Sequence, residues 1–280
     1  MKDEIINKIS NEVKDRGAFS IKNFFDEKQF NSISNSLFDL ANKEKKKILF
    51  PINLKQFLIK IIKFEFKKFQ TSKKLINVSN KLKLKKIASN ILGKEAFLET
   101  LDCYLSKKSD EQILEWHNDI GYKQDSGSKK NFFNEALATV KEENKASSRG
   151  IKFFVHLTDV RSNNGALGII PYSHKIVTAL TKLIAYNKID LNPYWKLRDL
   201  RNYLENKDIR EKIIEFVNKD QLNKFIDYSK FININKDTYD FDYQVEKNSA
   251  VIFDELCVHR GSAPTKNDRL VLRYLYRRKK

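Results

Sequence analysis

Apolar residues recur at helical spacing in the first third of the chain. This spacing predicts helices over residues 3–15, 26–43 and, in several pieces, 54–92. Asp26 is placed to cap the second of these helices, and Leu92-Gly93 is a suitable end for the last one, because glycine readily takes the left-handed conformation that closes a helix. The first third of the chain is therefore predicted to be mainly helical, with one short strand at 18–22.

Farther along the chain, apolar and polar positions alternate, as is typical of β-strands with one buried face. Strands are predicted over 97–105, in the residues leading to His117, and over 242–246, 250–255 and 269–277. Helical spacing returns between these strands, for example over 175–187, 194–206 and 208–218. The pattern predicts an α+β fold with a mainly β core, an N-terminal helical layer and a helical insertion.

Length and composition fit one enzyme domain. The chain has 280 residues, 41% of them hydrophobic and 12% aromatic, which is enough for a sizeable core. It begins with charged residues rather than an apolar run, and no apolar stretch approaches the roughly 20 residues that span a bilayer. Cys103 and Cys257 are too few for a disulfide framework and are interpreted as small buried thiols. A cytoplasmic protein is expected; the oligomeric state is left open.

The net charge of +18 is concentrated in one segment. Residues 43–86 contain fifteen lysines and two glutamates, with apolar residues at helical spacing among them. A basic amphipathic helix can make peripheral contact with an anionic membrane, bind nucleic acid or attract an acidic substrate. The favoured interpretation is simpler: an apolar face packs on the core and the lysines are solvated. Nucleic acid is a disfavoured partner because neither an aromatic stacking platform nor an arginine-rich groove is evident.

The most informative motif is His117-Asn118-Asp119, followed much later by His259. Side chains two apart on an extended segment point to the same side, so His117 and Asp119 can bind one ion while Asn118 points away. Two imidazoles and one carboxylate form the facial triad that holds non-haem Fe(II). A His-x-Asp pair also occurs by chance, but the chain has only four histidines, at 117, 156, 174 and 259. Zinc or manganese would accept the same ligands.

Arg269 follows His259 by ten positions and opens a strand rich in β-branched and aromatic residues. A guanidinium binds a carboxylate through two parallel hydrogen bonds, so Arg269 is a candidate anchor for a dicarboxylate that also binds the metal. Arg273 lies on the same strand face and is the reserve candidate. This arginine favours iron with a keto-acid cosubstrate over zinc or manganese.

Several ordered motifs resemble the phytanoyl-CoA dioxygenase-like branch of the Fe(II)/2-oxoglutarate oxygenases. They are the segments Val13–Asp26, Phe153–Val160, Asn164–His174, Ala250–Asp254 and His259–Pro264, together with the His-x-Asp pair. The resemblance implies a double-stranded β-helix, a jelly-roll or cupin-like barrel, with N-terminal helices packed on one side and a helical insertion over its mouth. It also implies Fe(II) bound by His117, Asp119 and His259, with 2-oxoglutarate held by Arg269 and dioxygen as the oxidant.

On this interpretation residues 1–280 form a single oxygenase domain. Its parts are an N-terminal helical layer at 26–92, barrel strands within 97–174 and 242–277, and the insertion at 175–241. The segment 121–149 is predicted to be a lid that excludes water from the reaction.

Some positions depart from the family pattern or keep two interpretations. Tyr172 stands where the family usually has glycine, and Gly261 stands where some members use serine to help hold the cosubstrate, a role that Ser262 or Thr265 would have to fill. Tyr104 is either a hydrogen-bond donor to the cosubstrate or a core residue. Trp116 is expected to pack against the barrel, and His174, like Tyr172, either lines the pocket rim or stabilises its turn.

The function that these residues predict is oxidation of a small organic substrate. The hypothesis is an Fe(II)/2-oxoglutarate-dependent dioxygenase that hydroxylates an aliphatic C–H bond and releases succinate and CO2. Because Asp119 is retained, the resemblance favours a hydroxylating or desaturating type over a halogenating one, in which a small residue replaces this carboxylate. The positive charge suggests an anionic or carrier-linked substrate. The alternatives are a basic nucleic-acid-binding protein or a barrel that has lost catalysis.

Overall fold

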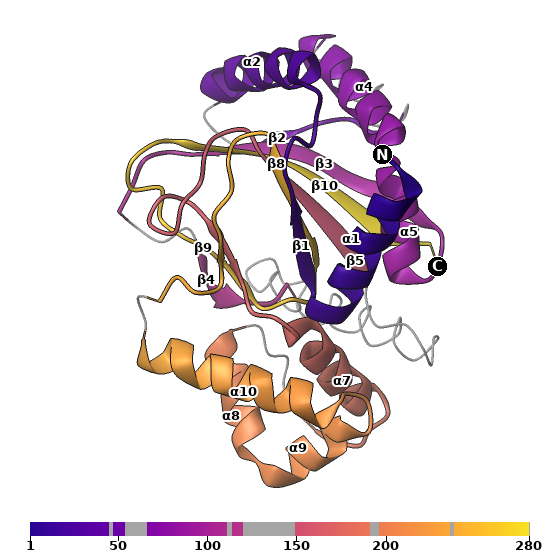
Figure 1. Ribbon diagram of the computed structural model, residues 1–280, viewed down its shortest axis with the longest axis vertical. Helices are drawn as coiled ribbons and strands as arrows, with labels where there is room; N and C mark the ends of the chain where they lie inside the picture. The colour runs from indigo at the N-terminus through magenta and orange to yellow at the C-terminus, as the bar shows by residue number, and fades with distance from the viewer. Residues whose placement is uncertain are drawn as a thin grey trace.

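A computed structural model of the chain describes residues 1–44, 47–53, 66–110, 114–119, 149–190, 196–235 and 238–279. Two antiparallel sheets form the middle of the molecule, with one group of helices beside the larger sheet and a second group at the opposite end (Figure 1). The α+β fold with a mainly β core is confirmed.

The larger sheet has the strand order β1-β8-β5-β10-β3-β2, and every neighbouring pair is antiparallel. Its strands are β1 (Ala18–Ile21), β2 (Ile48–Leu49), β3 (Ala96–Ser106), β5 (Gly150–His156), β8 (Ser249–Asp254) and β10 (Arg269–Arg278). The central strand β5 is buried along its whole length. Because side chains alternate along a strand, Phe153 and Val155 join the core under the helices, whereas Phe154 joins the core on the opposite side.

The smaller sheet has the order β4-β9-β6-β7. Its strands are β4 (Leu114–His117), β6 (Leu167–Ile169), β7 (Asp242–Tyr243) and β9 (His259–Gly261). Leu167 and Ile169 of this sheet share a buried cluster with Phe154, Phe253 and Val271 of the larger one. Two antiparallel sheets that enclose a common core form the double-stranded β-helix that the motifs implied.

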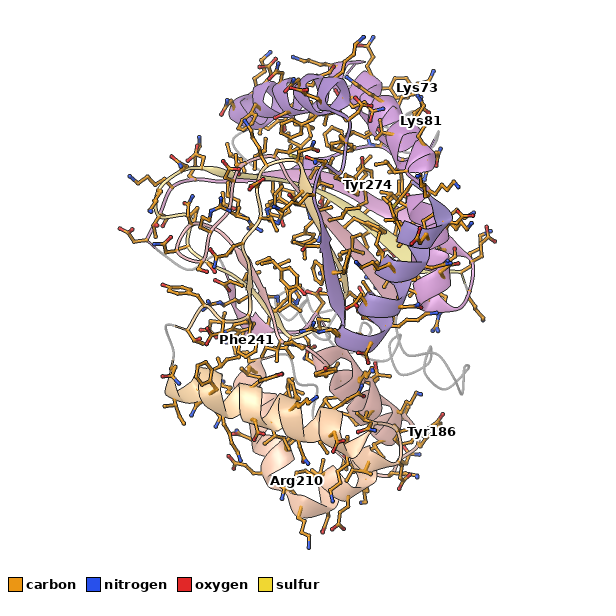
Figure 2. All side chains as sticks on the ribbon, viewed as in Figure 1. Lys73, Lys81, Tyr186, Arg210, Phe241 and Tyr274 are labelled. Atoms are coloured by element: carbon orange, nitrogen blue, oxygen red, sulfur yellow. The ribbon has the colours of Figure 1, made fainter. Side chains whose placement is uncertain are left out.

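The N-terminal helices cover the outer face of the larger sheet (Figure 1). They are α1 (Asp3–Arg16), α2 (Glu27–Glu44), α4 (Phe66–Lys81) and α5 (Leu84–Leu92). Gly17 and Gly93, both with positive φ, end α1 and α5, and the predicted stop at Gly93 is confirmed. Tyr274 of β10 lies under this layer, where its hydroxyl donates a hydrogen bond to the carbonyl of Leu75, 3.3 Å away (Figure 2).

The lysine-rich segment is described only in part, because residues 45–46 and 54–65 lie outside the described residues. In the remainder, Leu75 and Val78 of α4 are buried against α2 and the sheet, while Lys73 and Lys81 point outward (Figure 2). Several lysines pair with acids, including Lys67 with Asp39 at 3.1 Å. For this part of the segment, the expectation of an apolar face on the core with solvated lysines is confirmed except at Lys68, which is buried and pairs with Glu44 at 2.6 Å.

In its described residues, 175–190, 196–235 and 238–241, the insertion contains four helices that pack on one another. They are α7 (Ser173–Ala185), α8 (Leu197–Glu205), α9 (Lys207–Ile214) and α10 (Lys219–Ile234). The sequence analysis predicted several helices across 175–230, with bounds near those of the first three, and gave no separate bounds for α10, whose start is capped by the Asn218 side chain. The group packs against Trp116 and Val258, at the outer side of β4 and β9 (Figure 1).

Two further predictions concern the segment 121–149 and membrane-spanning helices. The proposed lid at 121–149 lies almost entirely outside the described residues. Across the part of the chain that the structure describes, no helix combines the length and apolar character that a membrane crossing requires.

Candidate metal centre

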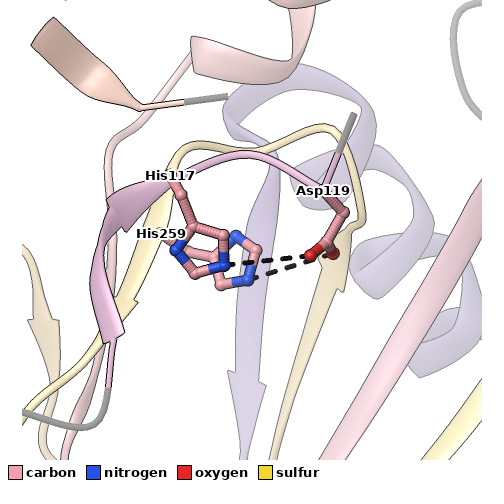
Figure 3. Close-up of side chains that lie close together, drawn as sticks. All are labelled: His117, Asp119 and His259. Carbon is pink, nitrogen blue, oxygen red and sulfur yellow. Dashed lines mark ion pairs between the residues drawn. The ribbon is translucent and has the colours of Figure 1, made fainter. Parts of the chain in front are cut away.

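His117, Asp119 and His259 come together at one point of the molecule (Figure 3). One ligand atom from each side chain lies within 4.8 Å of the other two. His117 ends β4, Asp119 follows two residues later, and His259 begins β9. β4 and β9 pair antiparallel with His117 directly opposite His259, so the sheet brings the distant histidine to the His-x-Asp pair.

Backbone carbonyls orient both imidazole rings. The Nδ1 atom of His117 is 2.6 Å from the carbonyl oxygen of Glu115, and the Nδ1 atom of His259 is 2.8 Å from that of Cys257. A ring that donates its Nδ1 proton to a carbonyl carries its lone pair on Nε2. The Nε2 atoms of His117 and His259 lie 3.8 and 4.0 Å from the Asp119 carboxylate oxygens. Both lone pairs therefore face the carboxylate, across a space suited to a shared ion.

The three side chains are in the protonation states that a metal requires. Burial lowers the pKa of His259 to about 3 and also lowers the pKa of His117, although Asp119 opposes both shifts. Burial acts to raise the pKa of Asp119, but the positive charge of Lys152 outweighs it and lowers that pKa. Neutral imidazoles and an ionised carboxylate are the forms that bind divalent cations.

Lys152 is a site residue that the sequence reasoning missed. It lies in the middle of β5, is only 5% exposed, and its ammonium forms an ion pair with the Asp119 carboxylate. Burial lowers the pKa of Lys152, and Asp119 opposes this shift. A lysine inside a strand whose other residues are mostly apolar was the available signal, since a charge is rarely buried without a partner.

Arg269 is buried at the start of β10, with its guanidinium carbon 5.8 Å from the centre of the Tyr104 ring. Its Nε atom is buried and has no hydrogen-bond partner in the part of the chain that the structure describes. A buried N–H without an acceptor is costly, so this donor is suited to an anionic ligand. Tyr104 remains protonated because burial raises its pKa, and its hydroxyl can therefore donate a hydrogen bond.

Two other residues shape the surroundings of Arg269. Gly165, with φ +76°, approaches so closely that a Cβ atom there would lie 2.8 Å from the Cδ atom of Arg269. His156 is fully buried, and both of its ring nitrogens lack hydrogen-bond partners among the described residues. Burial, and after it the charge of Arg269, lowers the pKa of His156 well below its usual value. The sequence analysis assigned no role to His156.

The reserve anchor Arg273 already has a carboxylate partner. Its Nε atom donates to Asp102 at 2.9 Å, and Lys47 also pairs with Asp102, at 2.8 Å. Asp102 is fully buried, so two cations share one enclosed carboxylate. Between the two arginines, the donor without a partner belongs to Arg269, which makes Arg269 the better anchor.

A cavity of about 230 Å³ joins these groups. It is lined by Lys47, Tyr104, Leu114, His117, Asp119, Lys152, Phe154, Leu167, His259, Gly261, Arg269 and Arg273. The predicted metal ligands, Tyr104 and Arg269 thus line one space, together with the unpredicted Lys152. None of its described lining residues belongs to the helical insertion, which packs on the other side of β4.

Four side chains considered in the sequence analysis lie away from this cavity. The Ser262 hydroxyl donates to Asp242 at 3.3 Å, and Trp116 stacks with Arg260, 4.9 Å from the guanidinium carbon to the ring. His174 contacts the Lys14 carbonyl through Nε2 at 3.2 Å. Tyr172, in the left-handed conformation, precedes α7. These contacts favour structural roles for all four.

Both cysteines are buried free thiols, as expected. Burial raises the pKa of Cys103 and of Cys257, so both sulfurs remain protonated and poorly reactive.

The donor set and its surroundings fit a bound metal with an anionic cosubstrate. Two Nε2 lone pairs and a carboxylate oxygen face one point, the donor set with which a facial triad would hold a divalent ion. The Arg269 Nε atom and the ring nitrogens of His156 supply buried polar groups without partners in the described residues. These groups could receive the far end of a dicarboxylate.

Comparison with known proteins agrees with this chemistry. The family model described as "Phytanoyl-CoA dioxygenase (PhyH)" matches residues 13–270, which is most of the chain. No curated protein matches the sequence.

Several solved structures share the fold at low sequence identity. The non-haem α-ketoglutarate-dependent epimerase SnoN from nogalamycin biosynthesis is 11% identical with a TM-score of 0.54, over 99% of this chain and 84% of SnoN. HygX from Streptomyces hygroscopicus, solved with nickel and 2-oxoglutarate bound, is 13% identical with a TM-score of 0.53, over 97% of this chain and 87% of HygX. Apo EctD from S. alaskensis is 11% identical with a TM-score of 0.54, over 97% of this chain and 76% of EctD.

Proposed function

Because the chain belongs to the phytanoyl-CoA dioxygenase family, we propose that it is an Fe(II)/2-oxoglutarate-dependent dioxygenase that oxidises a small organic substrate. The observation that carries the proposal is the convergence of His117, Asp119 and His259, whose ligand atoms lie within 4.8 Å of one another. The names of two similar structures support the cofactor assignment, since SnoN is α-ketoglutarate-dependent and HygX was solved with nickel and 2-oxoglutarate. In this proposal residues 1–280 work as one oxygenase domain.

The roles of the residues follow from their positions. His117, Asp119 and His259 would hold Fe(II), with the ring orientations fixed by the carbonyls of Glu115 and Cys257. Arg269 would bind the far carboxylate of 2-oxoglutarate, using the Nε donor that lacks a partner in the described residues. Tyr104 would donate a further hydrogen bond to the cosubstrate. Ser262 is not part of the proposed set, because its hydroxyl donates to Asp242 and it does not line the cavity.

The reaction outcome is the finer part of the proposal. When bound, Fe(II) and 2-oxoglutarate supply the activation of dioxygen, with release of succinate and CO2. The protein's part is to hold the substrate beside the metal ligands and to exclude water, and the cavity walls Phe154 and Leu167 provide apolar surface for this. We propose hydroxylation of an aliphatic C–H bond, since Asp119 keeps the third ligand position for a carboxylate. The similar structures also include an epimerase and a carbocyclase, so the fold serves more than one oxidative outcome.

The test is an anaerobic titration. Protein with Fe(II) and 2-oxoglutarate is expected to develop the weak visible charge-transfer band of a chelated keto acid. His259→Ala should abolish the band because a metal ligand is lost. In Arg269→Ala the band should develop only at a 2-oxoglutarate concentration at least about tenfold higher, because a charge-assisted bidentate contact is lost.

The matched control is His174→Gln, which removes an imidazole that lies outside the cavity. This variant should give the wild-type band. A folded wild-type protein without the band, or a band that survives in His259→Ala, would contradict the proposed function. Succinate release measured over a panel of small molecules in air then identifies the substrate.

A further inference from the structure

The cavity at the candidate metal centre contains more positive than negative side chains. Among the described residues its walls carry Lys47, Lys152, Arg269 and Arg273, while Asp119 lines it and Asp102 lies directly behind it. The divalent ion and the dianionic 2-oxoglutarate of the proposed function would cancel each other's charge. Four cationic groups would then face two carboxylates. An excess positive charge inside a protein is unfavourable unless an anion joins it.

Lys152 is the group most affected by metal binding. In the structure its ammonium pairs with Asp119 and lies 5.5 Å from the centre of the Phe253 ring, with 5% of the residue exposed. A divalent cation bound to Asp119 would draw on the same carboxylate. Lys152 would then remain buried beside a divalent cation, and both would share the single negative charge of Asp119. A further anion would reduce the repulsion between the two cations.

The strand register separates Lys152 from the predicted 2-oxoglutarate anchor. Lys152 pairs with Leu275 of β10, whereas Arg269 lies six residues earlier on that strand, beyond the end of its ladder with β5. Six residues of strand span roughly 20 Å between Cα atoms, so the side chains of Lys152 and Arg269 enter the cavity from well-separated points of the sheet. The cosubstrate carboxylate that Arg269 holds is therefore distinct from the anion that Lys152 lacks.

Arg273 lies beside Lys152 and extends the same positive region. It pairs with Phe154, two residues after Lys152, so the two side chains are diagonal neighbours on one face of the sheet. Lys47, whose side chain is 53% exposed, reaches the same group from the rim by sharing Asp102 with Arg273. Because Arg273 and Lys47 share the single negative charge of Asp102, a net positive charge remains between the cavity rim and Lys152.

We propose that the substrate carries an anionic group, a carboxylate or a phosphate, that binds between Lys152 and Arg273 beside the metal ligands. This inference rests on the proposed function and names the substrate class of that site. When Asp119 binds the metal, the substrate anion takes its place as the partner of the Lys152 ammonium. It also fixes which end of the substrate faces the metal, since an acidic group held at Lys152 places the adjoining carbon atoms next to His117 and His259.

The first experiment measures anion binding without turnover. Protein loaded with Ni(II) and 2-oxoglutarate is titrated with acetate, inorganic phosphate and the neutral acetamide in a calorimeter. Acetate or phosphate is expected to bind saturably and acetamide is not, and the stronger anion identifies the acidic group. Lys152→Met should weaken anion binding at least about tenfold, as should Arg273→Gln, because each removes a charge from an enclosed pair. The control Lys188→Met, at an exposed lysine outside the cavity, should bind as wild type.

The outcomes separate this inference from the proposed function. A wild-type protein that binds Ni(II) and 2-oxoglutarate but takes up acetate and phosphate no better than acetamide would overturn only the inference. The wild-type comparison and Arg273→Gln decide the question even if Lys152→Met does not fold. If Lys152→Met weakens 2-oxoglutarate binding as strongly as Arg269→Ala does, the lysine serves the cosubstrate and the inference is wrong. Failure of wild type to bind 2-oxoglutarate would instead contradict the proposed function.

The second experiment uses the Fe(II) enzyme in air. Succinate release is measured with carboxylic acids and phosphate monoesters, each compared with its neutral methyl ester or parent alcohol. The acids are expected to stimulate release more than their neutral partners, and Lys152→Arg, which keeps the charge, should retain part of that preference. Equal stimulation by the neutral partners would overturn the inference.

Discussion

His117 and His259 face each other across the pairing of β4 and β9, with their ring centroids 4.4 Å apart. Each ring is held at Nδ1 by the carbonyl of the residue two positions before it. The two imidazoles therefore have the same local arrangement on two antiparallel strands, and both direct Nε2 toward Asp119. A rigid sheet that fixes two ligands lowers the entropy lost when the metal binds.

Replacement of Gly165 by alanine is expected to weaken 2-oxoglutarate binding. The new Cβ atom would lie 2.8 Å from the Cδ atom of Arg269, so the guanidinium would have to move away from its position in the cavity. We expect the dissociation constant of 2-oxoglutarate, measured on the Ni(II) protein, to rise about tenfold, the effect of roughly 1.4 kcal/mol.

Gly93→Ala is the matched control for this substitution. Gly93 also has a positive φ, +69°, but a Cβ atom there would meet nothing within 4 Å. Both variants should therefore lose about 1 kcal/mol of unfolding free energy from backbone strain, while 2-oxoglutarate affinity falls only in Gly165→Ala. Equal affinities in the two variants would show that Gly165 does not position Arg269.

Ser262→Ala is expected to leave 2-oxoglutarate affinity unchanged. The Ser262 hydroxyl donates to Asp242, which also accepts from Arg260 at 3.2 Å, and neither contact faces the cavity. Loss of one such hydrogen bond should lower the unfolding free energy by about 1 kcal/mol, measured by urea unfolding. If Ser262→Ala instead raises the dissociation constant of 2-oxoglutarate about tenfold or more, Ser262 does contact the cosubstrate.

Local spacing was sufficient for the α+β pattern and for placing His117 and Asp119 together, whereas the double-stranded β-helix and the approach of His259 were expected from the family resemblance, because they depend on long-range strand pairing. Alternating apolar residues located most long strands, and the period of two placed His117 and Asp119 on one side of the chain. The bounds of the helix α10, within the predicted helical region, were not assigned because its buried residues, such as Leu222 and Phe225, are separated by many polar ones.

That Lys152 lines the cavity and that Ser262 does not could not be predicted in the same way. Which charged groups become neighbours depends on the register between strands distant in sequence, such as the pairing of Lys152 with Leu275 on one side and Phe253 on the other. Ser262 directly follows Gly261, the last residue of β9, and of the two only Gly261 lines the cavity. A shift of one residue reverses the face of a side chain, and spacing alone does not fix that shift.

Acidification is expected to destabilise the protein through its buried histidines, and His174 allows a direct test. Burial lowers the pKa of His174 from its usual 6.5 to about 4. Below pH 6.5 the unfolded chain therefore binds a proton that the folded chain does not, and the free energy of unfolding falls as the pH decreases toward 4. One such group contributes a loss of about 2 kcal/mol between pH 6.5 and 5.

The measurement is urea unfolding of wild type and His174→Gln at pH 7 and pH 5. The glutamine amide can still donate to the Lys14 carbonyl, which His174 contacts at 3.2 Å, but it does not titrate. The variant should lose less stability than wild type between the two pH values, by about 2 kcal/mol. An equal loss in both proteins would show that His174 is not held neutral by burial.

Removal of the Lys152 charge is expected to weaken the metal-free protein and to strengthen its response to metal. Lys152→Met would leave the partly buried Asp119 carboxylate without its cation, and breaking a largely buried ion pair lowers the unfolding free energy by about 3 kcal/mol. Ni(II) should then raise the melting temperature more in the variant than in wild type, because the metal no longer competes with an ammonium for Asp119 and is no longer repelled by it.

Lys188→Met again serves as the control, since the pair of Lys188 with Glu215 is exposed and its loss should cost no more than about 1 kcal/mol. Thermal unfolding with and without Ni(II), in the absence of 2-oxoglutarate, separates the two cases. If Lys152→Met and wild type gain equal stability from Ni(II), Lys152 and the metal do not share Asp119. In that case the ion pair seen between β5 and the His-x-Asp segment would be structural, and the charge balance of the cavity would have to be explained without it.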